Sequence, residues 1–156
     1  MIVTVPSRPK YLEEEFFIPK QNPVMKIVKI KDGMLIYNMK GVLIGQMLEE
    51  SHETIVSIAD AGSLRIKRIG KEIEIKSLGE DGDVGRRIPG KFVLFGKPEI
   101  GQYTVFRIYP TSVKPKLFMQ AVLHPIDEKL INIRAEDGEN TLLAMLLGLG
   151  IGSILK

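Results

Sequence analysis

Hydrophobic and polar residues alternate along most of the chain, in short runs that end at glycine. In one such run, Leu64 to Ile69, aliphatic residues alternate with Arg65 and Lys67, and the run stops at Gly70. A period of two residues is the pattern of a half-buried β-strand, and glycine favours turns. Ten runs of this kind cover residues 26–30, 34–38, 42–48, 54–58, 64–69, 72–76, 91–95, 103–109, 117–123 and 129–133. Their number and spacing predict an all-β sandwich or barrel.

The first 23 residues contain four prolines, which exclude long regular structure there because proline fixes φ and lacks a backbone donor. We expect an extended arm with short edge strands at 2–5 and 15–18. A length of 156 residues and a hydrophobic fraction of 44% are typical of one globular domain. The expected organisation of residues 1–156 is therefore an N-terminal arm over 1–23, barrel strands over 24–135 and a helix over 140–155.

The last segment, residues 141–155, predicts a helix that is apolar on every side. It has no polar stripe before Ser153, and Asn140 or Thr141 can cap its start. Such a helix needs an enclosure, which a membrane, an oligomer core or a β-barrel can supply. Fifteen residues span about 22 Å, whereas a bilayer core is about 30 Å thick. Three glycines, at 148, 150 and 152, indicate that another element packs close to the backbone, as a barrel wall would, since glycine costs a helix about 1 kcal/mol.

This combination resembles the tubby-like superfamily, which includes LURP-one-related proteins and phospholipid scramblases. The segments that carry the resemblance are 37–45 (YNMKGVLIG), 58–66 (IADAGSLRI) and the apolar tail 142–155. The resemblance implies a mainly β fold with one helix, in which a closed antiparallel β-barrel of about 12 strands encloses the hydrophobic C-terminal helix. A cysteine-rich stretch and an acidic calcium-binding segment of the scramblase kind have no counterpart here, so scramblase activity is not inferred.

Residues with catalytic or metal-binding chemistry are few. The chain has no cysteine, and its two histidines, His52 and His124, are far apart and form no metal-binding motif. No nucleophile elbow or paired catalytic carboxylates are apparent. We therefore expect no catalytic residues, no metal and no cofactor, and we classify the chain as a non-enzyme. The absence of cysteine also fits a reducing, cytoplasmic location.

The remaining candidate site is basic. The net charge of +3 gives a mild preference for anionic partners, and basic residues gather in two places. The candidate ligand-binding residues are Arg65, Lys67, Arg68, Lys71, Arg86 and Arg87. Two interpretations stay open: these residues bind a phosphate-bearing ligand, or Arg65 and Lys67 are simply the solvated outer face of a strand whose inner face carries Leu64 and Ile66.

Taken together, the sequence predicts a non-enzymatic binding or scaffolding protein that contacts an anionic ligand or a membrane surface through a basic outer face. Nucleic acid is disfavoured, because aromatic residues are only 6% of the chain. One alternative is a tail-anchored membrane protein with residues 141–155 in the bilayer, and a third, weaker one is an enzyme with a site built from loops. The scarcity of asparagine and glutamine, eight in total, is typical of a thermophilic protein.

Overall fold

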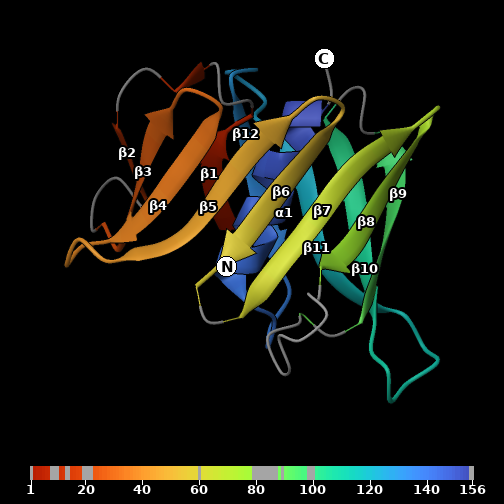
Figure 1. Ribbon diagram of the computed structural model, residues 1–156. Helices are drawn as coiled ribbons and strands as arrows, with labels where there is room; N and C mark the ends of the chain where they lie inside the picture. The colour runs from red at the N-terminus through yellow and green to blue at the C-terminus, as the bar shows by residue number, and fades with distance from the viewer. Residues whose placement is uncertain are drawn as a thin grey trace.

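The computed structural model describes residues 2–7, 11–12, 15–18, 23–59, 61–78, 88, 90–97 and 101–154. Within them the chain forms twelve strands followed by one helix (Figure 1). The elements are β1 (Ile2–Pro6), β2 (Glu15–Ile18), β3 (Met25–Ile30), β4 (Gly33–Asn38), β5 (Leu43–Glu50), β6 (Glu53–Ile58), β7 (Gly62–Ile69), β8 (Glu72–Leu78), β9 (Lys91–Lys97), β10 (Gln102–Ile108), β11 (Lys116–Leu123), β12 (Leu130–Ala135) and α1 (Thr141–Ile154). Each of the ten predicted runs coincides with a strand, and the ends differ by at most two residues.

The strands form two antiparallel sheets. Strands β2 to β8 pair in chain order and make a seven-stranded sheet, as expected for successive hairpins with short turns. The second sheet has five strands in the order β1-β12-β11-β10-β9, so the N-terminal strand pairs with the last one. In that pair Ile2 lies opposite Arg134 and Pro6 lies opposite Leu130. The structure therefore confirms a mainly β fold with one C-terminal helix, and its hydrogen bonds define two sheets.

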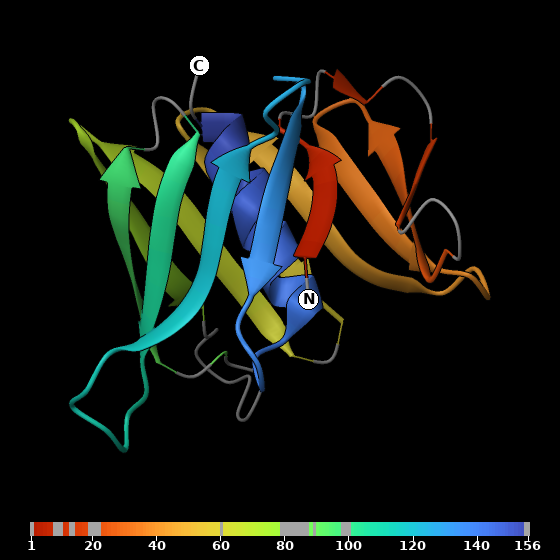
Figure 2. The same cartoon turned by 180° about the vertical axis from the view of Figure 1, so that it is seen from behind.

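Helix α1 lies between the two sheets. The seven-stranded sheet crosses in front of it in Figure 1, and the five-stranded sheet covers it in the view from behind (Figure 2). It packs on β5, β6 and β7 of one sheet and on β1, β11 and β12 of the other. Leu146 and Leu147 are fully buried, and every residue from 143 to 152 is buried. This enclosure explains why the helix has no polar stripe, because no side of it faces water.

The glycines of the helix mark its closest approaches to the strands. A Cβ atom on Gly148 would meet the side chain of Ile133 in β12, and one on Gly150 would meet Ile66 in β7. A Cβ atom on Gly152 would meet the backbone carbonyl of Ser7. The close packing expected at these three positions is confirmed, and it involves both sheets.

The start of helix α1 is capped by one of the two residues predicted for this role. The Oδ1 atom of Asn140 accepts a hydrogen bond from the backbone N–H of Leu143 at 3.1 Å, which is N-cap geometry. The backbone carbonyl of Asn140 accepts the first helical bond, from the N–H of Ala144. Of the two capping residues predicted, Asn140 is the cap and Thr141 is the first helical residue.

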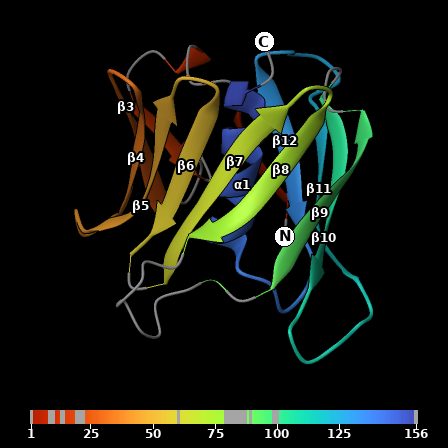
Figure 3. The same cartoon turned by 45° about the vertical axis from the view of Figure 1, so that its right-hand side comes forward.

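The two sheets meet at two seams. At one seam β1 approaches β2, and at the other β8 approaches β9 (Figure 3). Each of these four strands is the edge of its sheet, and within the described residues no backbone hydrogen bond crosses either seam. The strands thus surround the helix, and in the part of the chain that the structure describes they form two sheets rather than one hydrogen-bonded ring.

Candidate functional site

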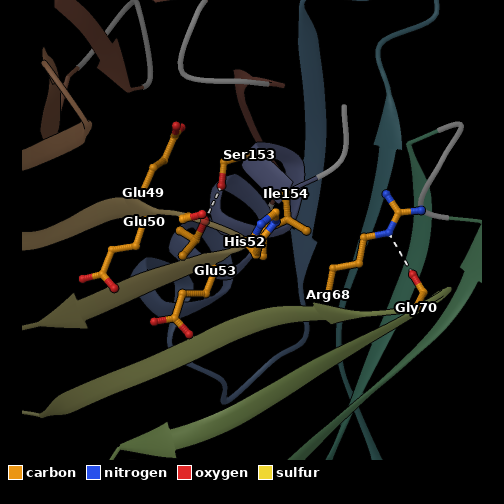
Figure 4. A pocket seen from close by; sticks show the side chains of 10 residues that line it. Glu49, Glu50, His52, Glu53, Arg68, Gly70, Ser153 and Ile154 are labelled. Carbon is orange, nitrogen blue, oxygen red and sulfur yellow. Dashed lines mark hydrogen bonds between the residues drawn. The ribbon is translucent and has the colours of Figure 1, made fainter.

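A cavity of about 490 Å³ opens at the C-terminal end of α1, between the β5–β6 and β7–β8 hairpins. Residues 49–54 of the first hairpin line one side of it, and Arg68 and Gly70 of the second hairpin line the other. The end of the helix contributes Ser153 and Ile154 (Figure 4). We call this cavity the hairpin-end pocket.

Strand alternation explains why Arg68 reaches this pocket. Leu64 and Ile66 are fully buried and face the helix, and Arg68 has the same parity two residues further along β7. Because Arg68 lies beyond the end of the core, its side chain extends over the mouth of the fold and stays exposed. Its Nε–H donates a hydrogen bond to the carbonyl of Gly70 at 3.2 Å. Among the described residues, no carboxylate lies within salt-bridge distance of its guanidinium group.

The acidic residues beside the pocket point away from Arg68. Figure 4 shows the side chains of Glu49, Glu50 and Glu53 extending to the side opposite the arginine, with His52 between the two groups. Glu53 forms an ion pair with Arg65 on the outer face, with Nε and Oε2 at 3.8 Å. Glutamates thus line one side of the pocket and Arg68 the other, and the imidazole of His52 lies between them.

His52 is placed by an unusual backbone conformation. It occupies the two-residue turn between the paired residues Glu50 and Glu53, and its φ angle is +68°. Such left-handed positions favour glycine and, among other residues, asparagine, aspartate and histidine. The turn thus sets the direction in which the side chain of His52 leaves the backbone.

Two hydroxyls of the pocket, those of Thr54 and Ser153, form hydrogen bonds within the protein. The Oγ–H of Ser153 donates to the carbonyl of Gly150 at 2.8 Å, and Thr54 Oγ1 lies 2.7 Å from Ser153 Oγ (Figure 4). With the proton of Ser153 directed to a backbone carbonyl, Thr54 is the donor of the second bond. This arrangement links β6 to the end of α1. Within the described residues, the hydroxyl of Ser153 is bonded to Thr54 and to a backbone carbonyl, neither of which is a base that would make it a nucleophile.

The structure separates the basic residues that the sequence singled out. Arg65 and Lys67 lie on the outer face of β7, as the second interpretation predicted, and Lys67 is opposite Glu53 on one side and Glu74 on the other. Arg68 lines the hairpin-end pocket, whereas Lys71 lines a different cavity, between β8 and β9. Arg86 and Arg87 lie outside the described residues.

A buried charged cluster lies at the opposite end of the helix. The Nη1 atom of Arg107 donates to Oε2 of Glu139 at 3.0 Å, and both side chains are more than nine-tenths buried. The hydroxyl of Tyr109 donates to Oε1 of the same carboxylate at 2.6 Å. The guanidinium group also lies 5.2 Å from the ring centre of Phe92 and 5.8 Å from that of Phe118. This cluster holds the start of α1 against β10.

Sequence reasoning missed most of these residues. The sequence marked His52 only as a histidine outside any metal-binding motif. The pairing of Thr54 with Ser153 depends on how far the helix extends between the sheets, and no local sequence pattern encodes that. A signal was present for Arg107, because it shares the inward parity of Tyr103 and Val105 on β10. A charged residue at a core-facing position predicts a buried partner.

Neither a metal centre nor a membrane span emerges from the described residues. No three of their His, Cys, Asp and Glu side chains form a group that could hold a metal ion. No helix in this part of the chain is both long and apolar enough to cross a bilayer. Comparisons of the chain with known protein families, with curated proteins and with solved structures give no match.

Proposed function

We propose that the chain is a non-enzymatic binding or scaffolding protein of the cytoplasm that holds a phosphate-bearing ligand in the hairpin-end pocket. The observation that carries this proposal is the position of Arg68. Its guanidinium group lines the pocket without a carboxylate partner among the described residues, and the neighbouring glutamates point away from it. A planar guanidinium group offers paired N–H donors that match phosphate oxygens.

The surroundings limit the kind of anion. The C-terminal end of a helix carries partial negative charge, and three glutamates lie nearby, so a highly charged anion meets repulsion. We therefore expect a ligand with one phosphate group, bound weakly and with strong dependence on salt. The phosphate can belong to a lipid headgroup at a membrane surface or to a free metabolite, since both present the same chemistry.

A second part of the proposal concerns how the two sheets close around the helix. We infer that the two sheets act as one antiparallel barrel of the tubby-like kind, closed around α1 by packing at its two seams. The burial of residues 143–152 supports this arrangement over a tail anchor, because a bilayer-inserted helix would have to leave the strands. A rigid frame of this kind keeps the two hairpins of the pocket at a fixed separation.

The test compares Arg68→Ala with Lys67→Ala in the full-length protein. Lys67 is the adjacent basic residue, is also exposed, and lies on the opposite face of β7. Binding of inorganic phosphate is followed by NMR shifts, and binding to vesicles of phosphatidylcholine, with or without phosphatidic acid, by sedimentation. Loss of one charged hydrogen bond predicts that Arg68→Ala weakens binding about tenfold or more.

The phosphate titration and the vesicle assay together distinguish a free phosphate ligand from a lipid headgroup. Binding to acidic vesicles without binding of free phosphate identifies a membrane surface, and the reverse identifies a small ligand. His52→Asn keeps the left-handed turn and removes the imidazole, so it reports whether His52 takes part. Equal weakening by Arg68→Ala and Lys67→Ala, or no effect of either, would overturn the pocket as the binding site.

A further inference from the structure

Exposed apolar side chains gather at one corner of the seven-stranded sheet. Among the described residues, eleven large apolar side chains are exposed. Five of them lie where strands β2 to β5 meet their turns, namely Phe17, Val24, Met39, Val42 and Leu43. We call these five residues the apolar corner. Apolar side chains that gather on the surface of a monomer are typical of interaction sites.

Strand pairing brings part of the apolar corner together on the outer face of the sheet. Phe17 on β2 lies opposite Lys26 on β3, and Lys26 lies opposite Tyr37 on β4. Tyr37 in turn lies opposite Leu43, the first residue of β5. Ile36, the neighbour of Tyr37, is fully buried, so the row that contains Tyr37 faces away from the core. Phe17 and Leu43 therefore belong to one surface.

The rest of the corner surrounds the tip of the β4–β5 hairpin, which projects from the body of the molecule (Figure 1 and Figure 2). Met39 and Val42, in the turn, are 50% and 55% exposed. Val24 precedes the residue that pairs with Asn38, so it lies next to Met39 in register. The Oδ1 atom of Asn38 accepts hydrogen bonds from the backbone N–H groups of Lys40 at 2.9 Å and Val42 at 3.0 Å. The tip is thus ordered before it meets a partner, and binding there loses little conformational entropy.

The charges around the apolar corner are mainly positive. Lys40, at the tip, is exposed and forms no ion pair with a described carboxylate. The Nζ atom of Lys26 lies 5.9 Å from the ring centre of Tyr37 and 3.6 Å from Oε1 of Glu15. Glu15 is two residues from Phe17 on the same face of β2, and its carboxylate is already paired. The corner therefore offers an unpaired cation beside apolar side chains.

This combination fits an anionic membrane surface better than a second copy of the chain. A symmetric dimer places the same patch on both subunits, so two Lys40 side chains would meet with no unpaired described carboxylate to offset them. A protein partner also needs a groove that matches a projecting tip, whereas lipids rearrange around inserted side chains. At a bilayer surface, apolar side chains enter the boundary between headgroups and acyl chains, and lysine reaches the phosphates.

We propose that the apolar corner is a membrane-contact site, in which Met39, Val42 and Leu43 insert into the interface of a bilayer that contains anionic lipid and Lys40 binds the headgroups. Insertion of this kind reaches about 5–10 Å into the boundary between headgroups and acyl chains. The hairpin-end pocket lies at the other end of β5, about 20 Å away along the strand. The inference therefore does not rest on the proposed phosphate ligand.

A single tryptophan tests the insertion directly, because the chain has none of its own. Val42→Trp in the full-length protein reports on the tip, and Val113→Trp reports on another exposed valine, in the loop between β10 and β11. The probe is a vesicle of phosphatidylcholine with about 30% phosphatidylserine, and phosphatidylcholine alone is the lipid control. With the acidic vesicles we expect a blue shift of Val42→Trp emission and quenching by brominated acyl chains. Val113→Trp should show neither change.

Polar substitutions of similar size test the natural side chains. Met39→Gln combined with Val42→Thr should weaken binding to the acidic vesicles at least tenfold in a sedimentation assay, because apolar burial is lost. Val113→Thr combined with Ile126→Gln makes the matched change at two other exposed residues and should leave binding unchanged. All four residues are exposed, so the variants should fold, and thermal unfolding checks this.

Charge reversal tests the role of the lysine at the tip. Lys40→Glu should weaken binding to the acidic vesicles about tenfold, because an attraction to anionic headgroups becomes a repulsion. Lys114→Glu makes the same change of net charge on the exposed β10–β11 loop and should weaken binding by no more than about twofold.

Three outcomes would overturn the proposal. The first is no binding of the acidic vesicles, or equal weakening by the substitutions at Val113 and Ile126. The second is a concentration-dependent dimer that Met39→Gln with Val42→Thr dissociates, which would assign the corner to a second copy of the chain. In the third, Arg68→Ala abolishes vesicle binding and the corner substitutions do not, which would assign the membrane contact to the hairpin-end pocket. The pocket itself is judged by binding of inorganic phosphate, so the two proposals fail separately.

Discussion

Arg107 and Glu139 form a buried salt bridge, 3.0 Å long, between β10 and the residue that precedes the helix cap. Three aromatic rings surround the guanidinium group, and the closest is that of Tyr109, at 4.5 Å. Water therefore has little access to either charge, and each charge depends on the other for solvation. The pair ties the start of α1 to the five-stranded sheet.

A double-mutant cycle measures this dependence. Removing one partner leaves a buried charge uncompensated, so Arg107→Met or Glu139→Gln alone should lower the free energy of unfolding by about 3 kcal/mol or more. The double variant, which carries both substitutions, should lose clearly less free energy of unfolding than the sum of the two single losses. We expect a coupling energy of about 2 kcal/mol. Urea denaturation of the four proteins gives the values, and strict additivity would contradict the coupling.

The helix glycines provide a second prediction, which compares Gly152→Ala with Gly150→Ala. The new methyl group at 152 would press on the carbonyl of Ser7. Ser7 is held in place because its backbone N–H donates to the backbone carbonyl of Lys129 and its hydroxyl donates to the backbone carbonyl of Glu128. We expect Gly152→Ala to lower the free energy of unfolding by about 2 kcal/mol, because backbone cannot move aside cheaply.

Gly150→Ala is the matched variant in the same helix. Its methyl group would meet the far end of the Ile66 side chain, which can shift, and alanine raises helix propensity by about 1 kcal/mol. We therefore expect Gly150→Ala to lower the free energy of unfolding by less than about 1 kcal/mol. Thermal or urea unfolding of the two variants checks the order, and a larger loss for Gly150→Ala would contradict the packing described.

Much of this fold follows from the sequence, because local pattern encodes it. Alternation located the strands and predicted that Leu64 and Ile66 face inward, and the missing polar stripe predicted that residues 141–155 are enclosed. The pairing of β1 with β12 was out of reach, since contacts between distant strands leave no local pattern. Hydrogen bonding across the seams, which decides between one ring and two sheets, is equally invisible in the sequence.

The candidate site was less accessible for a related reason. The basic residues were grouped by proximity in sequence. Which of them reach a pocket depends instead on whether the side chain points inward from the strand and on whether the residue lies beyond the last buried one. Arg68 could have been separated from Lys67 by extending the inward series 64, 66, 68. The juxtaposition of His52 with the helix end could not have been predicted, because it depends on how far α1 extends between the sheets.

Alkaline pH should destabilise the protein through Tyr103, which is buried, and Tyr109, which is partly buried. Burial raises the pKa of Tyr103 well above its ordinary value, and its hydroxyl donates to the carbonyl of Gly148 at 3.0 Å. Burial, and then the hydrogen bond to Glu139, also raise the pKa of Tyr109. The unfolded chain ionises its tyrosines near pH 10, so it loses protons first as the pH rises. The stabilisation is complete below about pH 10 and falls above it.

Tyr103→Phe tests this linkage. At neutral pH it should lower the free energy of unfolding by about 1 kcal/mol, through loss of the hydrogen bond. Above pH 10 its stability should fall less steeply than that of the wild type. The variant lacks the Tyr103 hydroxyl, whose proton the unfolded chain releases more readily than the folded protein does. Urea denaturation at a series of pH values gives both slopes, and identical slopes would contradict the assignment to Tyr103.

The central claim is that α1 is the core of the fold, enclosed by both sheets, and amide hydrogen exchange in detergent-free buffer tests it most directly. The account predicts that the amides of residues 144–152 exchange only through global unfolding and are the slowest in the chain. Fast exchange in this segment, or a requirement for detergent to keep the protein in solution, would contradict it and would place the helix in a membrane or against a partner.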